Sequence, residues 1–148
     1  MIAVFLDSNV LLSSLIGSAE SPPVLLVDWL AGSSNASLMT GRCCIQEVER
    51  NLARKLPQAQ PLWEQFLVAS GIRVVPCPRQ PVPGINAKDE PVVAAAVVDG
   101  ATYFVTGDRR LLTENARLTA LLEAPGVEWR QLPKRSQPTI AEPEPSKL

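Results

Sequence analysis

The chain has 148 residues, of which 46% are hydrophobic and 20% are charged, so it is long and apolar enough to form one domain around a buried core. It contains no histidine, which excludes hydrolases that use a histidine base and zinc sites that use histidine ligands. The net charge of −1 excludes binding to nucleic acid through bulk positive charge, so such a contact would need a local basic patch or a metal ion.

The first half of the chain alternates short apolar runs with helical patterns. Residues 2–6 are typical of a buried parallel strand, and we expect the next helix to be capped by Ser8 or Asn9 and to end near Gly17. The further elements predicted in this half are a helix between Ser21 and Gly32, a strand at 36–40, helices at 43–56 and 60–71, and a strand at 72–76.

The second half continues the alternation after a proline-rich loop at 76–86. Its predicted elements are a helix at 89–100, a strand at 102–106, a helix from 113 to about 122 and a strand at 127–132. Alternating strands and helices predict an α/β fold with three α/β/α layers around a mainly parallel sheet of about five strands, in a domain over 1–132. Residues 133–148 are polar and proline-rich, and we expect a disordered tail.

The cysteine content and the length of the apolar runs bear on where in the cell the protein is expected. The cysteines are Cys43, Cys44 and Cys77, an odd number with two adjacent, so we expect no disulfide framework and a reduced, cytoplasmic protein. Cys43 and Cys44 begin a predicted helix, where a thiol can gain reactivity, although we expect both mainly to pack. No signal-peptide pattern and no apolar run of about 18 residues occurs, so we expect no membrane span.

Several carboxylates occupy related positions in the predicted sheet. The carboxyl ends of parallel strands share one edge, where ligands bind in open sheets of this kind. Two like charges about 4 Å apart repel by roughly 4 kcal/mol at an effective dielectric of 20, so such a cluster needs a proton or a cation. Oxygen ligands without histidine favour Mg²⁺ or Mn²⁺, and a metal-bound water can hydrolyse a phosphodiester. The carboxylates are Asp7, Glu47, Glu49, Asp89, Glu90 and Asp108.

Each of these acids alone has an ordinary structural explanation. Asp7 and Asp108 could cap helices, Asp89 with Glu90 could complement a helix dipole, and acids on the 43–56 helix could simply be solvated. Their common position after strands, or at the starts of helices, favours the metal site. Asp99 we expect on the surface.

Three stretches resemble the acidic motifs of the PIN-domain nucleases: "VFLDSNVLLSSL", "IQEVERNL" and "AKDEPVVAAAVVDGATYFVTGDRRLL". Within that family they are most similar to VapC-type toxins of prokaryotic toxin–antitoxin pairs, and the resemblance covers about residues 1–132. It implies a cytoplasmic Mg²⁺- or Mn²⁺-dependent endoribonuclease with an antitoxin partner, and it suggests a homodimer. By resemblance, the metal-binding catalytic residues are Asp7, Glu47, Asp89 and Asp108, supported by Asn9 and Thr106.

The choice of glutamate is open between two arguments. Glu49 lies about 55° and Glu47 about 145° from the centre of the apolar stripe of their helix, at about 100° per residue, so geometry favours Glu49 as the inward residue. The family pattern favours Glu47, which we adopt because the site lies at a sheet edge. Glu49 and Glu90 are kept as reserves.

Arg109 and Arg110 directly follow Asp108, so they are candidate phosphate contacts, with ordinary solvated charges as the alternative. Two other functions compete with the nuclease. One is a PIN-like binding module of little activity that acts through a protein or RNA partner. The other is a phosphotransfer receiver domain, which needs a lysine after a late strand where this chain has none nearby.

Overall fold

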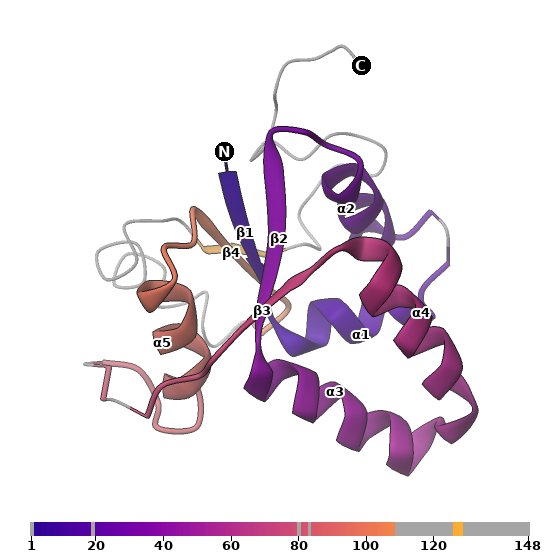
Figure 1. Cartoon of the computed structure of the whole chain (residues 1–148). Coiled ribbons are helices and arrows are strands. Elements are labelled where there is room, and N and C mark those ends of the chain that lie inside the picture. Colours follow the sequence, from indigo (N-terminus) through magenta and orange to yellow (C-terminus); the bar gives the residue numbers. More distant parts are fainter. Residues whose placement is uncertain (1, 19, 80, 83, 109–125, 129–148) are drawn as a thin grey trace.

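A computed structural model of the chain describes residues 2–18, 20–79, 81–82, 84–108 and 126–128 (Figure 1). The strands in these residues are β1 (Ile2–Leu6), β2 (Ala36–Gly41), β3 (Arg73–Val75), β4 (Tyr103–Thr106) and β5 (Gly126–Glu128). The helices are α1 (Ser8–Ile16), α2 (Pro22–Ala31), α3 (Arg42–Lys55), the short 3₁₀ helix η1 (Pro57–Ala59), α4 (Gln60–Ser70) and α5 (Glu90–Val98).

The strands form one sheet in the order β3-β2-β1-β4-β5, and each neighbouring pair is parallel. At the centre, Phe5 of β1 is in register with Met39 of β2 and with Phe104 of β4. The direction of chain progression reverses between β1 and β4, which makes the carboxyl ends of these two strands the topological switch point. Receiver domains have the strand order 2-1-3-4-5, so the alternative of a phosphotransfer receiver domain is wrong.

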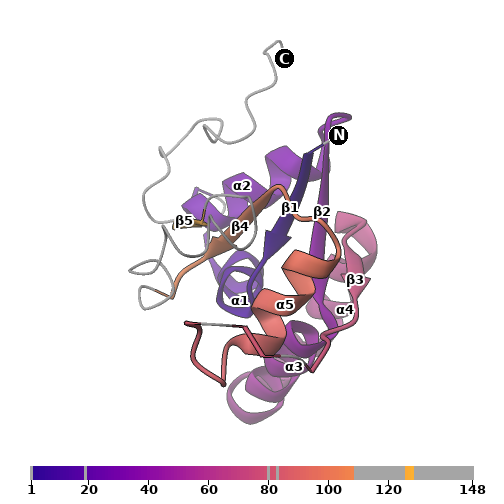
Figure 2. The same cartoon turned by 90° about the vertical axis from the view of Figure 1, so that its left-hand side faces the viewer.

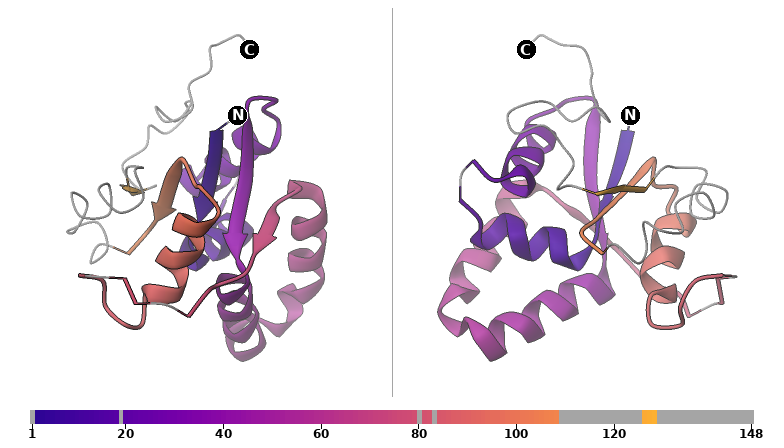
Figure 3. Two further views of the ribbon diagram at one scale, coloured as in Figure 1. Left: turned by 60° about the vertical axis from the view of Figure 1, so that its left-hand side comes forward. Right: turned by 180° about the vertical axis from the view of Figure 1, so that it is seen from behind.

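Helices cover the sheet on both faces, which confirms the three-layer α/β/α prediction. α1 and α2 lie on one face, and α5 lies on the other (Figures 1 and 2). α4 packs against α1 and α2, while α3 projects from the carboxyl end of β2 (Figure 3). Right-handed crossovers explain the layers, because the chain runs one way from β1 to β3 and then returns to β4. Phe5 and Phe104 stack in the core with ring centroids 5.5 Å apart.

Most predicted elements in the described residues are present, with ends shifted by one or two positions. The expected cap of the first helix is wrong: Asp7, rather than Ser8 or Asn9, is the N-cap of α1, and its carboxylate accepts a hydrogen bond from Ser8 N. The cause is that β1 ends at Leu6, so the helix begins one residue earlier than a Ser8 cap allows. The predicted 113–122 helix and 133–148 tail lie outside the described residues.

The expectation of no disulfide is also wrong, because Cys43 and Cys77 are bonded. The chain after β3 passes over the first turn of α3 and brings their Cα atoms to 6.0 Å, which suits a disulfide. Proximity between residues 34 apart depends on the course of the chain, so an odd cysteine count could not reveal it. Cys44 is a buried free thiol.

The helices of the described residues are too short or too polar to cross a membrane.

Candidate active site

The candidate site lies at the carboxyl ends of β1 and β4. Asp7 follows β1 directly, and its backbone N–H donates to Val105 O at 3.0 Å, so this residue is still held by β4. Asp108 lies two residues after the end of β4. The parallel pairing of the two strands therefore explains why residues about a hundred positions apart meet at this edge.

Asp7 is a buried carboxylate whose two oxygens are both hydrogen-bonded. Ser8 N donates to Oδ1 at 2.7 Å, and the Thr106 hydroxyl donates to Oδ2 at 2.7 Å. Only 7% of Asp7 is exposed. The first bond is the cap of α1 and the second reaches across from β4, so the carboxylate has a fixed orientation.

Ser8 connects Asp7 to Glu47 on α3. Its backbone N–H binds Asp7, and its hydroxyl donates to Glu47 Oε1 at 3.0 Å. Glu47 is exposed, whereas Glu49 turns to the other side of the helix, where Oε2 accepts from Trp63 Nε1 at 3.1 Å. The structure therefore brings Glu47, and not Glu49, to Asp7.

Thr106 and Asn9 hold the turn that carries Asp108. Asp108 N donates to Thr106 Oγ1 at 2.9 Å, and Gly107 N donates to Asn9 Oδ1 at 2.7 Å. Thr106 thus accepts from the backbone of Asp108 and donates to Asp7. Both residues that the resemblance marked as supporting lie where they can fix the relative positions of the two acids.

The acids of this edge perturb one another. The pKa of Asp7 is raised to about 6, mainly by burial and to a smaller extent by the negative charges of Glu47 and Asp108. The hydrogen bonds from Thr106 and Ser8 partly oppose this increase. Desolvation and the two like charges act in the same direction, and both disfavour the ionised form of Asp7.

Asp89 and Glu90 lie at the start of α5. Asp89 is the N-cap residue of that helix and is half-buried. Because α5 connects parallel strands β3 and β4, it begins at the same edge of the sheet as Asp7 (Figure 2). Glu90 Oε2 accepts from Val82 N at 3.2 Å and thereby holds the preceding loop.

Sequence reasoning missed Cys44 as a neighbour of Asp7. Its thiol lies 3.9 Å from Asp7 Oδ1, with sulfur as the donor. Burial, reinforced by Asp7, raises the pKa of this thiol to about 12, so it stays neutral. The available signal was spacing: Cys44 and Glu47 are three residues apart and share one face of α3.

The oxygen atoms around Asp7, from carboxylates and hydroxyls, are ligands that suit a hard divalent cation, and the neutral Cys44 thiol adds no charged soft ligand. In the conformation of the described residues, no three acidic or cysteine side chains lie within reach of one ion. Glu47 is exposed and Asp108 is partly exposed, so neither side chain is enclosed by the core. Arg109 and Arg110 lie outside the described residues.

The chain is a three-layer α/β/α sandwich with acids at the switch point of a parallel sheet, an architecture consistent with a PIN-like fold. A solved structure with this fold is "VapBC2 from Rickettsia felis bound to a DNA fragment from their promoter", one chain of which superposes with a TM-score of 0.62. The match covers 86% of this chain and 99% of that chain, with 12% identical residues, so it establishes the fold. No protein-family model and no curated protein sequence matches the chain.

Proposed function

We propose that the chain is a metal-dependent endoribonuclease, the toxin of a toxin–antitoxin pair. One observation carries this proposal: Asp7 is buried, and the negative charges of Glu47 and Asp108 act together with burial to raise its pKa. A protein keeps such a cluster when a cation or a proton resolves the repulsion.

Asp7, Glu47, Asp89 and Asp108 are the residues that would hold Mg²⁺ or Mn²⁺. When bound, the ion supplies an acidified water as nucleophile and neutralises charge that develops on a phosphodiester. The absence of histidine from the chain is consistent with this chemistry, since no imidazole base is available.

The chain's own polar residues orient the acids. Ser8 N and the Thr106 hydroxyl fix both oxygens of Asp7, and the Ser8 hydroxyl directs Glu47. Asn9 ties the backbone before Asp108 to α1. Partners of this kind commonly contribute 10- to 100-fold in metal affinity or activity.

The test is RNA cleavage by the purified protein with Mg²⁺ or Mn²⁺. Asp7→Asn and Asp108→Asn should each lower the rate by more than about 100-fold, because loss of a ligand should exceed loss of its outer partners. Asp28→Asn, an exposed acid of α2, is the matched control and should cleave normally. Normal cleavage by both site variants, with circular dichroism unchanged, would contradict the assignment.

An antitoxin partner is part of the proposal, and so is a homodimer. The support is the name of the structural neighbour, a VapBC2 complex, together with the motifs that resemble VapC-type toxins. Expression of the chain should arrest growth through RNA cleavage. If an adjacent gene encodes a small DNA-binding protein, its co-expression should suppress both effects. Persistence of both effects would favour an RNA-processing nuclease over a toxin.

A second candidate is a PIN-like binding module. The observation in its favour is that, in the described conformation, no three acids converge within reach of one cation. This function predicts a pure, folded protein that binds RNA or a protein partner but cleaves no RNA with either metal.

A further inference from the structure

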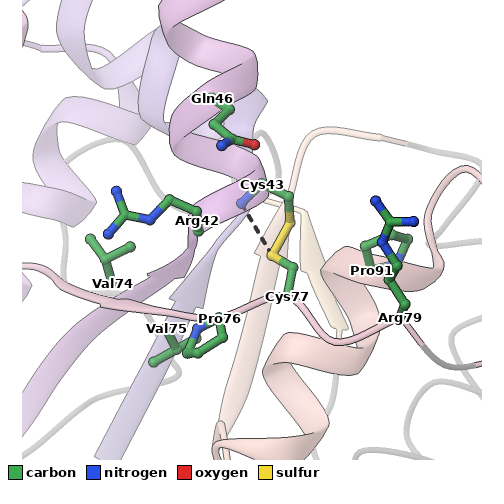
Figure 4. Close-up of a pocket in the computed structure, with 9 residues that line it drawn as sticks. All are labelled: Arg42, Cys43, Gln46, Val74, Val75, Pro76, Cys77, Arg79 and Pro91. Atoms are coloured by element: carbon green, nitrogen blue, oxygen red, sulfur yellow. Dashed lines mark hydrogen bonds between the residues drawn. A yellow bond between two sulfur atoms is a disulfide. The ribbon is translucent and has the colours of Figure 1, made fainter.

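The Cys43–Cys77 disulfide lies in a pocket whose described lining residues include none of the four acids proposed to bind metal. Cys43 belongs to the first turn of α3, Cys77 follows β3, and both are half-buried (Figure 4). The pocket has a volume of about 450 Å³, within the range of small-molecule sites. Both cysteines line it, so a small molecule in the pocket would contact the disulfide.

The start of α3 is arranged around the sulfur of Cys77. The N-cap residue, Gly41, provides no side-chain cap, and the backbone N–H of Cys43 donates to Cys77 Sγ at 3.2 Å. A Cβ atom on Gly41 would lie 2.6 Å from that sulfur, so glycine is needed for this close approach. Cys77 Sγ therefore occupies the position of a capping acceptor, where the helix N-terminus stabilises negative charge.

The pocket presents positive charge to an entering molecule. Arg42 and Arg79 lie on two sides of the disulfide, and none of the described residues that line the pocket is acidic (Figure 4). Within the part of the chain that the structure describes, the ion pair is Arg73–Asp99, and neither pocket arginine takes part in it. Gln46 adds a neutral polar group on the α3 side.

We propose that Cys43–Cys77 is a thiol–disulfide exchange site for small carboxylate-bearing thiols of the glutathione class. The guanidinium groups of Arg42 and Arg79 attract the carboxylates, and the thiolate attacks Cys43 Sγ. A sulfur–sulfur bond to Cys43 forms as the Cys43–Cys77 bond breaks, and its electron pair leaves on Cys77, which the Cys43 N–H and the α3 N-terminus stabilise.

A second thiolate completes the exchange by attacking the sulfur of the bound thiol. In total, two small thiols are oxidised to one disulfide, the protein disulfide is reduced to two cysteines, and the two protons pass from the small thiols to the protein. The small disulfide drives the same steps in reverse. This inference does not depend on nuclease activity, and its tests use none.

The first test counts thiols in the full chain purified in air. Alkylation after denaturation should label one cysteine, Cys44, and prior treatment with dithiothreitol should raise the count to three. Three labelled cysteines without dithiothreitol would overturn the proposal, since no disulfide would then be available for exchange.

The second test compares 3-mercaptopropionate with cysteamine, which are similar in size but opposite in charge. At low salt, and per thiolate, the anionic thiol should reduce the disulfide roughly tenfold faster, as expected for electrostatic steering. Arg42→Gln with Arg79→Gln, or high salt in the unchanged protein, should remove this preference. Arg54→Gln with Lys55→Gln, the same charge change at the far end of α3, should keep it.

Equal rates for the two thiols in the unchanged protein would overturn the proposal, and so would a preference that the pocket variants retain. Acid quenching and peptide mapping locate the first adduct. An adduct on Cys43 supports the assignment of Cys77 as leaving group, and an adduct on Cys77 contradicts it.

Discussion

Asp7 has two roles at once, because it ends β1 and caps α1. Its folded pKa of about 6 lies above the unfolded value of 3.8, so folding favours the protonated acid. Its contribution to stability is therefore fully present below pH 3.8 and is lost as the pH rises through about 6. At neutral pH the ionised form lowers the free energy of unfolding by roughly 3 kcal/mol, since one pKa unit corresponds to about 1.4 kcal/mol.

Asp7→Asn should therefore stabilise the cation-free protein at pH 8, by about 1–3 kcal/mol. Asparagine caps a helix as well as aspartate does, so the cap of α1 should remain. Urea denaturation at pH 4 and pH 8, with chelator present, measures the difference, which should be small at pH 4. Asp28→Asn should have no such effect, and destabilisation by Asp7→Asn at both pH values would contradict the argument.

Sequence patterns predicted the positions of single residues best where strands end. The positions of Asp7 and Asp108 follow from the rule that parallel strands present their carboxyl ends at one edge, whereas Thr106 was predicted from the family resemblance alone. The hydroxyl link from Ser8 to Glu47 and the Cys44–Asp7 contact were not predictable, because they depend on how α3 leaves β2. That direction is set by packing between helices, which local residue patterns do not specify.

At the scale of elements, α3 shows why a helical wheel can mislead. The wheel identified the face that packs inward, and Val48 and Leu52 are indeed buried there. Glu49 borders this face and accepts a hydrogen bond from Trp63 of α4. Glu47 lies away from it, yet it reaches Ser8 because the first turns of α3 pass the carboxyl edge of the sheet. A site at a sheet edge is therefore not found by asking which side chains point to the core.

Truncation of these two glutamates should give opposite results. Glu49→Ala removes the acceptor of the indole N–H of fully buried Trp63 and should lower the free energy of unfolding by about 1–3 kcal/mol, with cleavage by the folded protein retained. Glu47→Ala removes an exposed side chain and should leave stability within about 0.5 kcal/mol while cleavage falls. Chemical denaturation and RNA cleavage measure the two effects. A common loss of stability, or loss of cleavage in Glu49→Ala alone, would contradict the assignment.

At the scale of the whole molecule, the alternation of strands and helices predicted the layers, the parallel sheet and the edge that carries the acids. The strand order was not predictable from that alternation, because a right-handed crossover can add a strand on either side of β1. The disulfide was unpredictable for the same reason. Residue 77 passes over the start of α3 because β3 lies beyond β2, and that depends on the strand order.

An ion bound at the carboxyl ends of β1 and β4 should stabilise the whole fold. An ion that binds the acids only when β1 and β4 are paired binds the folded chain and not the unfolded one, so it should stabilise the molecule by about 2.7 kcal/mol at a concentration 100 times its Kd. For a chain of this size that corresponds to a rise in Tm of roughly 5–11 °C. Thermal denaturation with Mg²⁺ or Mn²⁺, against NaCl of equal ionic strength, should show the rise in the unchanged protein. Asp7→Asn should lose most of it while Asp28→Asn keeps it, and an equal rise in Asp7→Asn would mean that the ion binds elsewhere.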